Sequence, residues 1–199
     1  MNKLTYILIL SFLCICCGQN QDAEKETSNE KPIQTFSSFR LLKNELVEYD
    51  IDTLTNFNEI LKILDEIDCL QEYVVFKIDT GDKIFKIQPL QMCEDIFDYK
   101  LRQILYINAD SITINHKLKF PIDSLQTILK NHLVNPNNNE NYPLEKEIKL
   151  ISITIDGTKN IRDTKNLLLK IISIVNELEH KVNFSFMFES HGIIEVVEE

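Results

Sequence analysis

The sequence predicts a single α+β domain in which an antiparallel or mixed sheet packs against three to four helices. Three observations predict this class. Some segments carry apolar residues every three or four positions, as helices do, and others at every second position, as strands do. Both kinds of segment occur in each half of the chain. About 165 residues remain after a polar N-terminal region, which is enough for one domain with a sizeable core.

The chain begins with one lysine and a continuous apolar stretch from Leu4 to about Cys17. This stretch is shorter than the roughly 20 residues of a membrane-spanning helix, and it fits the apolar region of a secretory signal. It resembles a bacterial lipoprotein signal, in which cleavage follows a small residue and the next cysteine receives lipid. Residues 1–16 are therefore predicted to be the signal peptide. Cleavage before Cys17 leaves the small Cys16 at the cut, whereas cleavage before Cys16 or Cys14 would follow a bulky residue.

The resemblance implies a diacylated and N-acylated Cys17 that anchors the protein in a membrane of the cell envelope, where two or more acyl chains make anchoring stable. Gly18, rather than aspartate, follows this cysteine, and under the retention rule of enteric lipoproteins this favours the outer membrane. The sequence leaves open whether the domain faces the periplasm or the exterior. Residues 17–35 are otherwise polar and charged, so they are predicted to form a disordered tether.

Residues 36–199 are predicted to form the globular domain, whose first part, 36–100, contains helices and a hairpin. Apolar spacing predicts a helix over 36–46 and a second helix over 54–67, the latter capped by Asp52 or Thr53. Alternating runs on both sides of Gly81-Asp82 then predict a hairpin with a two-residue turn. In its register Phe76 lies opposite Ile87, and Ile78 lies opposite Phe85.

Beyond Cys17, the predicted site of lipidation, two cysteines remain in the chain, Cys69 and Cys93. The hairpin register places Cys69 opposite Glu94, one residue from Cys93. In an exported protein such a pair favours a disulfide, which would stabilise the fold by about 3 kcal/mol. The sequence leaves open whether the two residues form this disulfide or remain two buried thiols.

The second half, 101–199, is predicted to contain the following elements: strands over 104–108 and 112–116, a helix from Pro121 with Ile122, Leu125, Ile128, Leu129 and Leu133 on one face, a loop over 135–143, a strand over 148–155, a helix over 161–178, a strand over 182–188 and a last strand over 193–197. The order strand, strand, helix, strand, helix, strand over about 103–189 resembles the periplasmic domain of the ExbD/TolR family. The likeness lies in residues 104–115 leading into 121–125, and in the 151–156 strand before a long apolar helix and a phenylalanine-rich strand.

Members of the ExbD/TolR family carry a membrane helix with a proton-coupling aspartate, and this chain has neither. The resemblance therefore implies only a small α/β domain that contacts other envelope proteins or peptidoglycan. Pairing of a partner peptide with a sheet edge is one mode of contact that the likeness suggests. It implies no motor function.

Composition argues against a nucleic-acid-binding protein and against a protein that holds phosphate groups in a glycine-rich loop. The net charge is −10, which repels nucleic acid. The chain has only 4 glycines, and they are scattered, whereas loops that hold phosphate groups need clustered glycines for close backbone approach.

None of the isolated polar motifs in the sequence predicts a catalytic or metal-binding site. Asp79-Thr80-Gly81 resembles the triplet of aspartic proteases, but it occurs once, while those enzymes need two carboxylates. His116, His132, His180 and His191 show no metal-ligand spacing and are predicted to be surface or loop residues. Two groups of acidic residues are predicted to be solvated surface charge: Asp50, Asp52, Asp65, Glu66 and Asp68, and then Glu195, Glu198 and Glu199. Cation binding is the alternative for the first group.

The sequence therefore predicts a lipid-anchored envelope protein that acts as a non-enzymatic interaction or scaffold module, with no catalytic residue, cofactor or metal site. Two alternatives stay open. One is an envelope hydrolase that uses Cys93 or Asp79. The other is an immunity-type lipoprotein whose acidic surface blocks a basic toxin.

Overall fold

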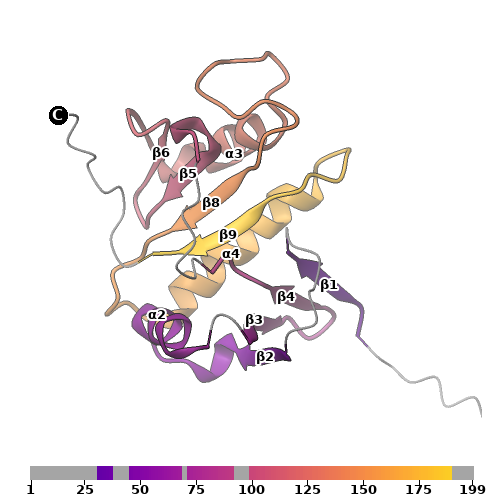
Figure 1. Ribbon diagram of the computed structural model, residues 1–199, viewed down its shortest axis with the longest axis vertical. Helices are drawn as coiled ribbons and strands as arrows, with labels where there is room; N and C mark the ends of the chain where they lie inside the picture. Colours follow the sequence, from indigo (N-terminus) through magenta and orange to yellow (C-terminus); the bar gives the residue numbers. More distant parts are fainter. Residues whose placement is uncertain (1–30, 38–44, 69–70, 92–98, 190–199) are drawn as a thin grey trace, which may run out of the picture. The chain divides into compact units, whose positions relative to one another are not determined.

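The computed structural model describes residues 31–37, 45–68, 71–91 and 99–189. These residues form one α+β domain with two mixed sheets and three α-helices, which confirms the predicted fold class. The strand order is β1-β4-β3-β2 in the first sheet and β7-β6-β5-β8-β9 in the second (Figure 1). The presence of two sheets instead of one was not foreseen.

The first sheet is built around a hairpin. Its strands are β1 (Ile33–Phe36), β2 (Glu45–Asp50), β3 (Glu72–Asp79) and β4 (Ile84–Ile87). Strands β3 and β4 are antiparallel, with Phe76 opposite Ile87 as predicted. Gly81 adopts a φ of 94° in the turn, where a side chain would be strained. The two outer strands are parallel to their neighbours, β1 to β4 and β2 to β3.

The prediction of a helix over 36–46 is wrong at both ends, because Phe36 lies in β1 and Leu46 lies in β2. Residues 38–44 between them lie outside the described residues. The apolar spacing matched a helix, but pairing with the distant strands β4 and β3 decides the conformation of these two segments. The first three residues of β1, 33–35, fall within 17–35, so the domain includes residues that were predicted to belong to the tether.

The second predicted helix is confirmed, but it begins later than expected. After a short 3-10 helix, Ile51–Thr53, α2 spans Phe57–Glu66. Its cap is Asn56, whose side chain accepts a hydrogen bond from the Glu59 amide at 3.3 Å. The Glu59 carboxylate in turn accepts from the Thr55 amide at 2.8 Å. These two bonds satisfy the Glu59 and Thr55 amides at the helix start, so Asp52 and Thr53 are not the caps.

The second sheet and its helices follow the predicted order, with one added strand. The elements are a 3-10 helix (Leu101–Gln103), β5 (Ile104–Ile107), β6 (Ser111–Ile114), β7 (Leu118–Pro121), a 3-10 helix (Ile122–Ser124), α3 (Leu125–Val134), β8 (Leu150–Ile153), α4 (Ile161–Asn176) and β9 (Ser185–Phe188). Pro121 ends the edge strand β7, a position where proline is tolerated, and it is also the N-cap of the 3-10 helix that leads into α3, so a helical stretch begins there as predicted. The strand predicted over 193–197 lies outside the described residues.

One hydrophobic cluster unites the two sheets and the three helices. Phe188 of β9 is central to it, because its ring lies 6.1 Å from that of Phe57 in α2 and 5.7 Å from that of Phe76 in β3. In Figure 1, α4 runs behind β9. None of the helices in the described ranges combines the length and apolar character that crossing a bilayer requires.

Candidate functional site

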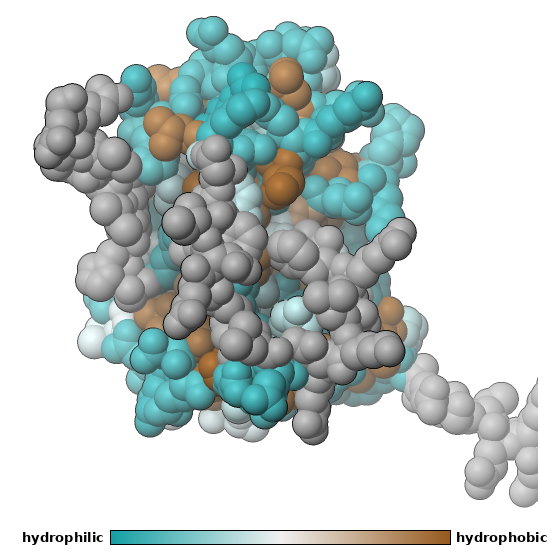
Figure 2. Space-filling view, viewed as in Figure 1, coloured by the Kyte–Doolittle hydropathy of each residue, from teal (hydrophilic) through white to brown (hydrophobic). Residues whose placement is uncertain are grey.

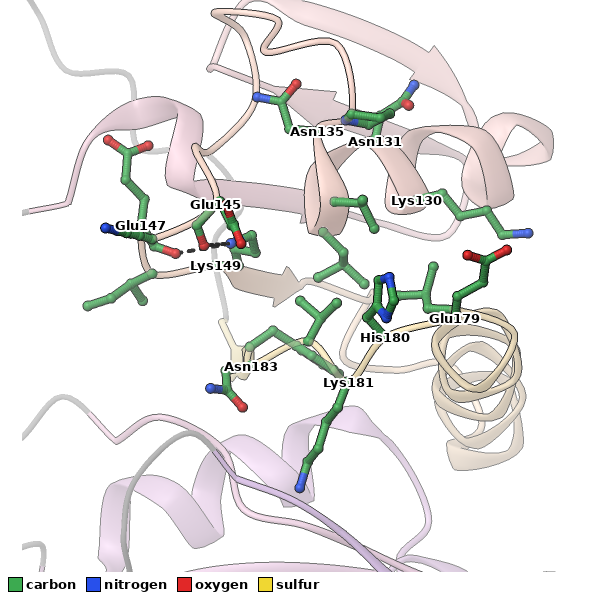
Figure 3. Close-up of a pocket in the computed structure, with 18 of the residues that line it drawn as sticks. Lys130, Asn131, Asn135, Glu145, Glu147, Lys149, Glu179, His180, Lys181 and Asn183 are labelled. Carbon is green, nitrogen blue, oxygen red and sulfur yellow. Dashed lines mark hydrogen bonds between the residues drawn. The ribbon is translucent and has the colours of Figure 1, made fainter.

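A cleft of about 1050 Å³ opens where α3 and α4 end and where β8 and β9 begin (Figure 3). Apolar side chains line it, and charged side chains surround them. The apolar members are Leu133, Val134, Ile148, Leu178, Val182 and Phe184. Its size lies at the upper limit of small-molecule pockets in proteins, about 1,000 Å³, so we take it as the first candidate site.

Lys149 lies in the wall of the cleft with only 4% of its surface exposed. Its ammonium donates to the main-chain carbonyl oxygens of Glu145 at 2.8 Å and Glu147 at 3.2 Å (Figure 3). It also donates to the carbonyl oxygen of Leu144 at 3.3 Å. Burial lowers the pKa of this ammonium. Because an ammonium has three donors, all of them are used in closing the 144–149 turn, and none is left for a ligand.

Glu147 fastens the same turn to the 3-10 helix before β5. Its carboxylate accepts from Arg102 Nη2 at 2.6 Å and Nε at 3.0 Å, and from Lys100 at 2.7 Å. The hydrogen bond from Arg102 is the main reason that the pKa of this carboxyl falls to about 2. Lys130 is paired as well, with Glu177 at 3.1 Å across α3 and α4. Several charged side chains around the cleft therefore form ion pairs that connect parts of the fold.

We expect a Lys149→Met variant to lose about 1–3 kcal/mol of stability, since three carbonyl oxygens lose their donor while the apolar volume stays similar. Hydrogen exchange should show the loss first in residues 144–149. Lys146→Met, which removes an exposed lysine of the same turn, is the matched control and should leave exchange unchanged. Equal protection in wild type and Lys149→Met would show that the carbonyl contacts contribute nothing.

A second polar cluster lies on the second sheet. Asn115 and His116 have φ values of 49° and 53°, and the Lys117 amide donates to the Ile114 carbonyl at 3.1 Å. These features define a type I′ turn between β6 and β7, where glycine is favoured at the position that His116 occupies. The imidazole Nε2 lies 2.6 Å from the Tyr106 hydroxyl, and the two rings pack edge to face at 4.7 Å.

The same cluster contains a half-buried carboxyl, that of Glu189. The Ser152 hydroxyl donates to the Glu189 carboxylate, and burial raises the pKa of Glu189. Burial, with a contribution from Glu189, also raises the pKa of the Tyr106 phenol, and burial lowers the pKa of His116. Burial therefore favours the uncharged forms of Glu189, Tyr106 and His116. Ser152 is fully buried, so it is not placed to attack a substrate.

The predicted hydrolase residues are not brought together. Asp79 Oδ1 accepts from the Gly81 amide at 2.7 Å, and both of its oxygens bind Lys31 Nζ, at 2.8 and 2.7 Å. The hydrogen bond from Lys31 is the main reason that the pKa of Asp79 is lowered. The carboxylate therefore holds the hairpin turn and β1, and its described contacts include no histidine. Cys17, Cys69 and Cys93 lie outside the described residues.

The prediction that all four histidines are surface or loop residues is wrong for His132. This residue lies in α3 with 0% of its surface exposed. It follows Ile128 and Leu129 by four and three positions, the spacing that places residues on one face of a helix. The sequence thus contained the signal, and the polar side chain obscured it. His180 is exposed at the cleft, and His191 lies outside the described residues.

Three residues of the first acidic group, Asp50, Asp52 and Glu66, lie in separate ion pairs. Asp50 pairs with Lys77 at 3.0 Å and Asp52 with Lys165 at 2.6 Å, while Glu66 and Lys62 approach to 3.7 Å. Within the described ranges, no three side chains of His, Cys, Asp or Glu are placed to hold a metal ion. Glu195, Glu198 and Glu199 lie outside those ranges.

No protein-family model, no curated protein and no solved structure matches the chain. The cleft and the Tyr106–His116 cluster are thus characterised by their own geometry. Neither is predicted from the sequence: the cleft joins residues that are distant along the chain, and the contact between Tyr106 and His116, ten residues apart, depends on the turn geometry at His116 and on Glu189 at the end of β9.

Proposed function

We propose that the protein is a bacterial envelope lipoprotein whose α+β domain acts as a non-enzymatic interaction module. The observation that carries this proposal is the short apolar leader that ends at Cys17 and is followed by a polar segment. Lipidation of Cys17 would hold the domain at a membrane, since each acyl CH₂ buried contributes about 0.8 kcal/mol. The partner class is another envelope protein or peptidoglycan.

The described surface is compatible with a module that works through contacts. On the face seen in Figure 2, it is mostly hydrophilic with small separate apolar areas. Polar groups that could serve catalysis have partners within the fold, as Asp79 has in Lys31 and Ser152 in Glu189. These contacts favour a binding role over the hydrolase alternative.

The test is purification of the tagged full-length protein from cross-linked envelopes. The proposal expects one or more envelope components to be enriched reproducibly with the wild-type chain. Enrichment should fall strongly for the Cys17→Ser variant produced at the same level, because an unanchored domain is no longer concentrated at the membrane. Recovery of no component above that of an unrelated tagged lipoprotein would contradict the proposed function.

A further inference from the structure

His132 is the most deeply buried titratable side chain behind the cleft. Its Nε2 lies 3.1 Å from the main-chain carbonyl oxygen of Leu150, the first residue of β8. Only an N–H can make this bond to a carbonyl, so the neutral ring carries its proton on Nε2. The bond joins the last turn of α3 to the start of the strand.

The other ring nitrogen, Nδ1, is buried and has no hydrogen-bond partner among the described residues. A second proton would have to be added at this atom. The charged ring would then present a buried donor without an acceptor, which costs far more than an unpartnered neutral nitrogen. The closed structure therefore accommodates only the neutral ring.

The charges around His132 act in the same direction. The nearby charge that acts on the ring is the ammonium of Lys149, itself buried and held by three carbonyl oxygens. On the other sides, Lys130 of α3 pairs with Glu177 beyond α4, and the loop contributes the neutral Tyr142 phenol. Burial is the main reason, and Lys149 a lesser one, that the pKa of His132 falls to about 3.

The position of this ring connects it to the cleft. Asn131 and Leu133, its neighbours in α3, line the cleft, and so does Lys149, which precedes the strand residue that His132 binds. The bond between His132 and Leu150 thus holds two walls of the cleft against each other. Beyond the helix, Asn135 Nδ2 donates to the Pro143 carbonyl at 3.0 Å and so keeps the loop in place.

We propose that His132 is an acid-sensitive latch: protonation of its imidazole releases the last turn of α3 from β8 and opens the wall of the cleft. The direction follows from linkage. In the open state the ring binds a proton below its ordinary pKa of about 6.5, while in the closed state it stays neutral. The closed state therefore loses stability as the pH falls from 6.5 toward 3. The inference does not depend on lipidation or on a partner.

Hydrogen exchange of the full-length protein in nonionic detergent tests the latch. At pH 5.0 the opening equilibrium constant for the amides of residues 131–135 should be about 25-fold larger than at pH 7.0, after correction for intrinsic exchange rates. Amides of β3, on the other side of the core, should change much less. An equal loss of protection in β3 would mean that the whole domain opens, and would overturn the latch.

Two variants separate the ring from other acid effects. His132→Gln retains an amide donor for Leu150 but does not titrate, so the change at residues 131–135 should disappear. His180→Gln removes an exposed histidine of the same cleft and should keep the full change. If His132→Gln does not fold, NMR of the wild-type ring decides: a His132 that is protonated at pH 5.0 while residues 131–135 stay protected would overturn the proposal.

Discussion

A Phe76→Ala variant is expected to lower the free energy of unfolding by about 3–5 kcal/mol, the range for removing a buried aromatic side chain. Phe76 has 0% of its surface exposed. Its ring packs edge to face on Phe188 of the second sheet at 5.7 Å and lies 6.2 Å from the ring of Tyr49 in β2. Alanine would remove both ring contacts and leave a cavity between the sheets. The free energy of unfolding of natural domains is about 5–15 kcal/mol, so this loss is a large part of the total stability.

Denaturant titration followed by far-ultraviolet circular dichroism measures the effect, since the chain contains no tryptophan. Phe120→Ala is the matched control, because the same change is then made at a half-buried position in the edge strand β7. It should cost clearly less than Phe76→Ala. Equal losses of unfolding free energy for the two variants would show that the contacts of Phe76 between the sheets add no stability.

A Cys17→Ser variant is expected to move the protein from the membrane fraction to the soluble fraction, or to leave it with an uncleaved leader. Serine has no thiol, so no thioether to lipid can form. In the proposed lipoprotein, two or more acyl chains, each contributing about 0.8 kcal/mol per buried CH₂, are lost together. Fractionation after a high-salt wash, with mass spectrometry of the N-terminal peptide, measures both consequences.

Cys14→Ser is the control for Cys17→Ser, because it changes a cysteine of the same leader that the proposed cleavage removes. This variant should stay in the membrane fraction and yield the same lipidated N-terminal peptide as wild type. A Cys17→Ser protein that has lost its leader and still sediments with envelopes after the wash would contradict anchoring through residue 17.

The hairpin shows which part of the fold could be predicted. Its register follows from a two-residue turn and from alternation within one short stretch, so Phe76 and Ile87 could be matched from local residues alone. The burial and contacts of the polar residues at the candidate sites could not be predicted from local residues in this way. Lys149 binds carbonyls of its own turn, but its burial depends on α3 and β9. The contact between Tyr106 and His116 requires the strained turn between β6 and β7.

The sequence by itself determined the α+β class, the hairpin, most helices and strands, and the expectation of a lipid-modified Cys17. Tertiary structure decided that Phe36 and Leu46 belong to strands, that the strands divide into two sheets, and that His132 is fully buried. The physical reason is the range of the interactions. Periodicity and turns act over a few residues, whereas parallel pairing and burial depend on partners that only the folded chain brings near.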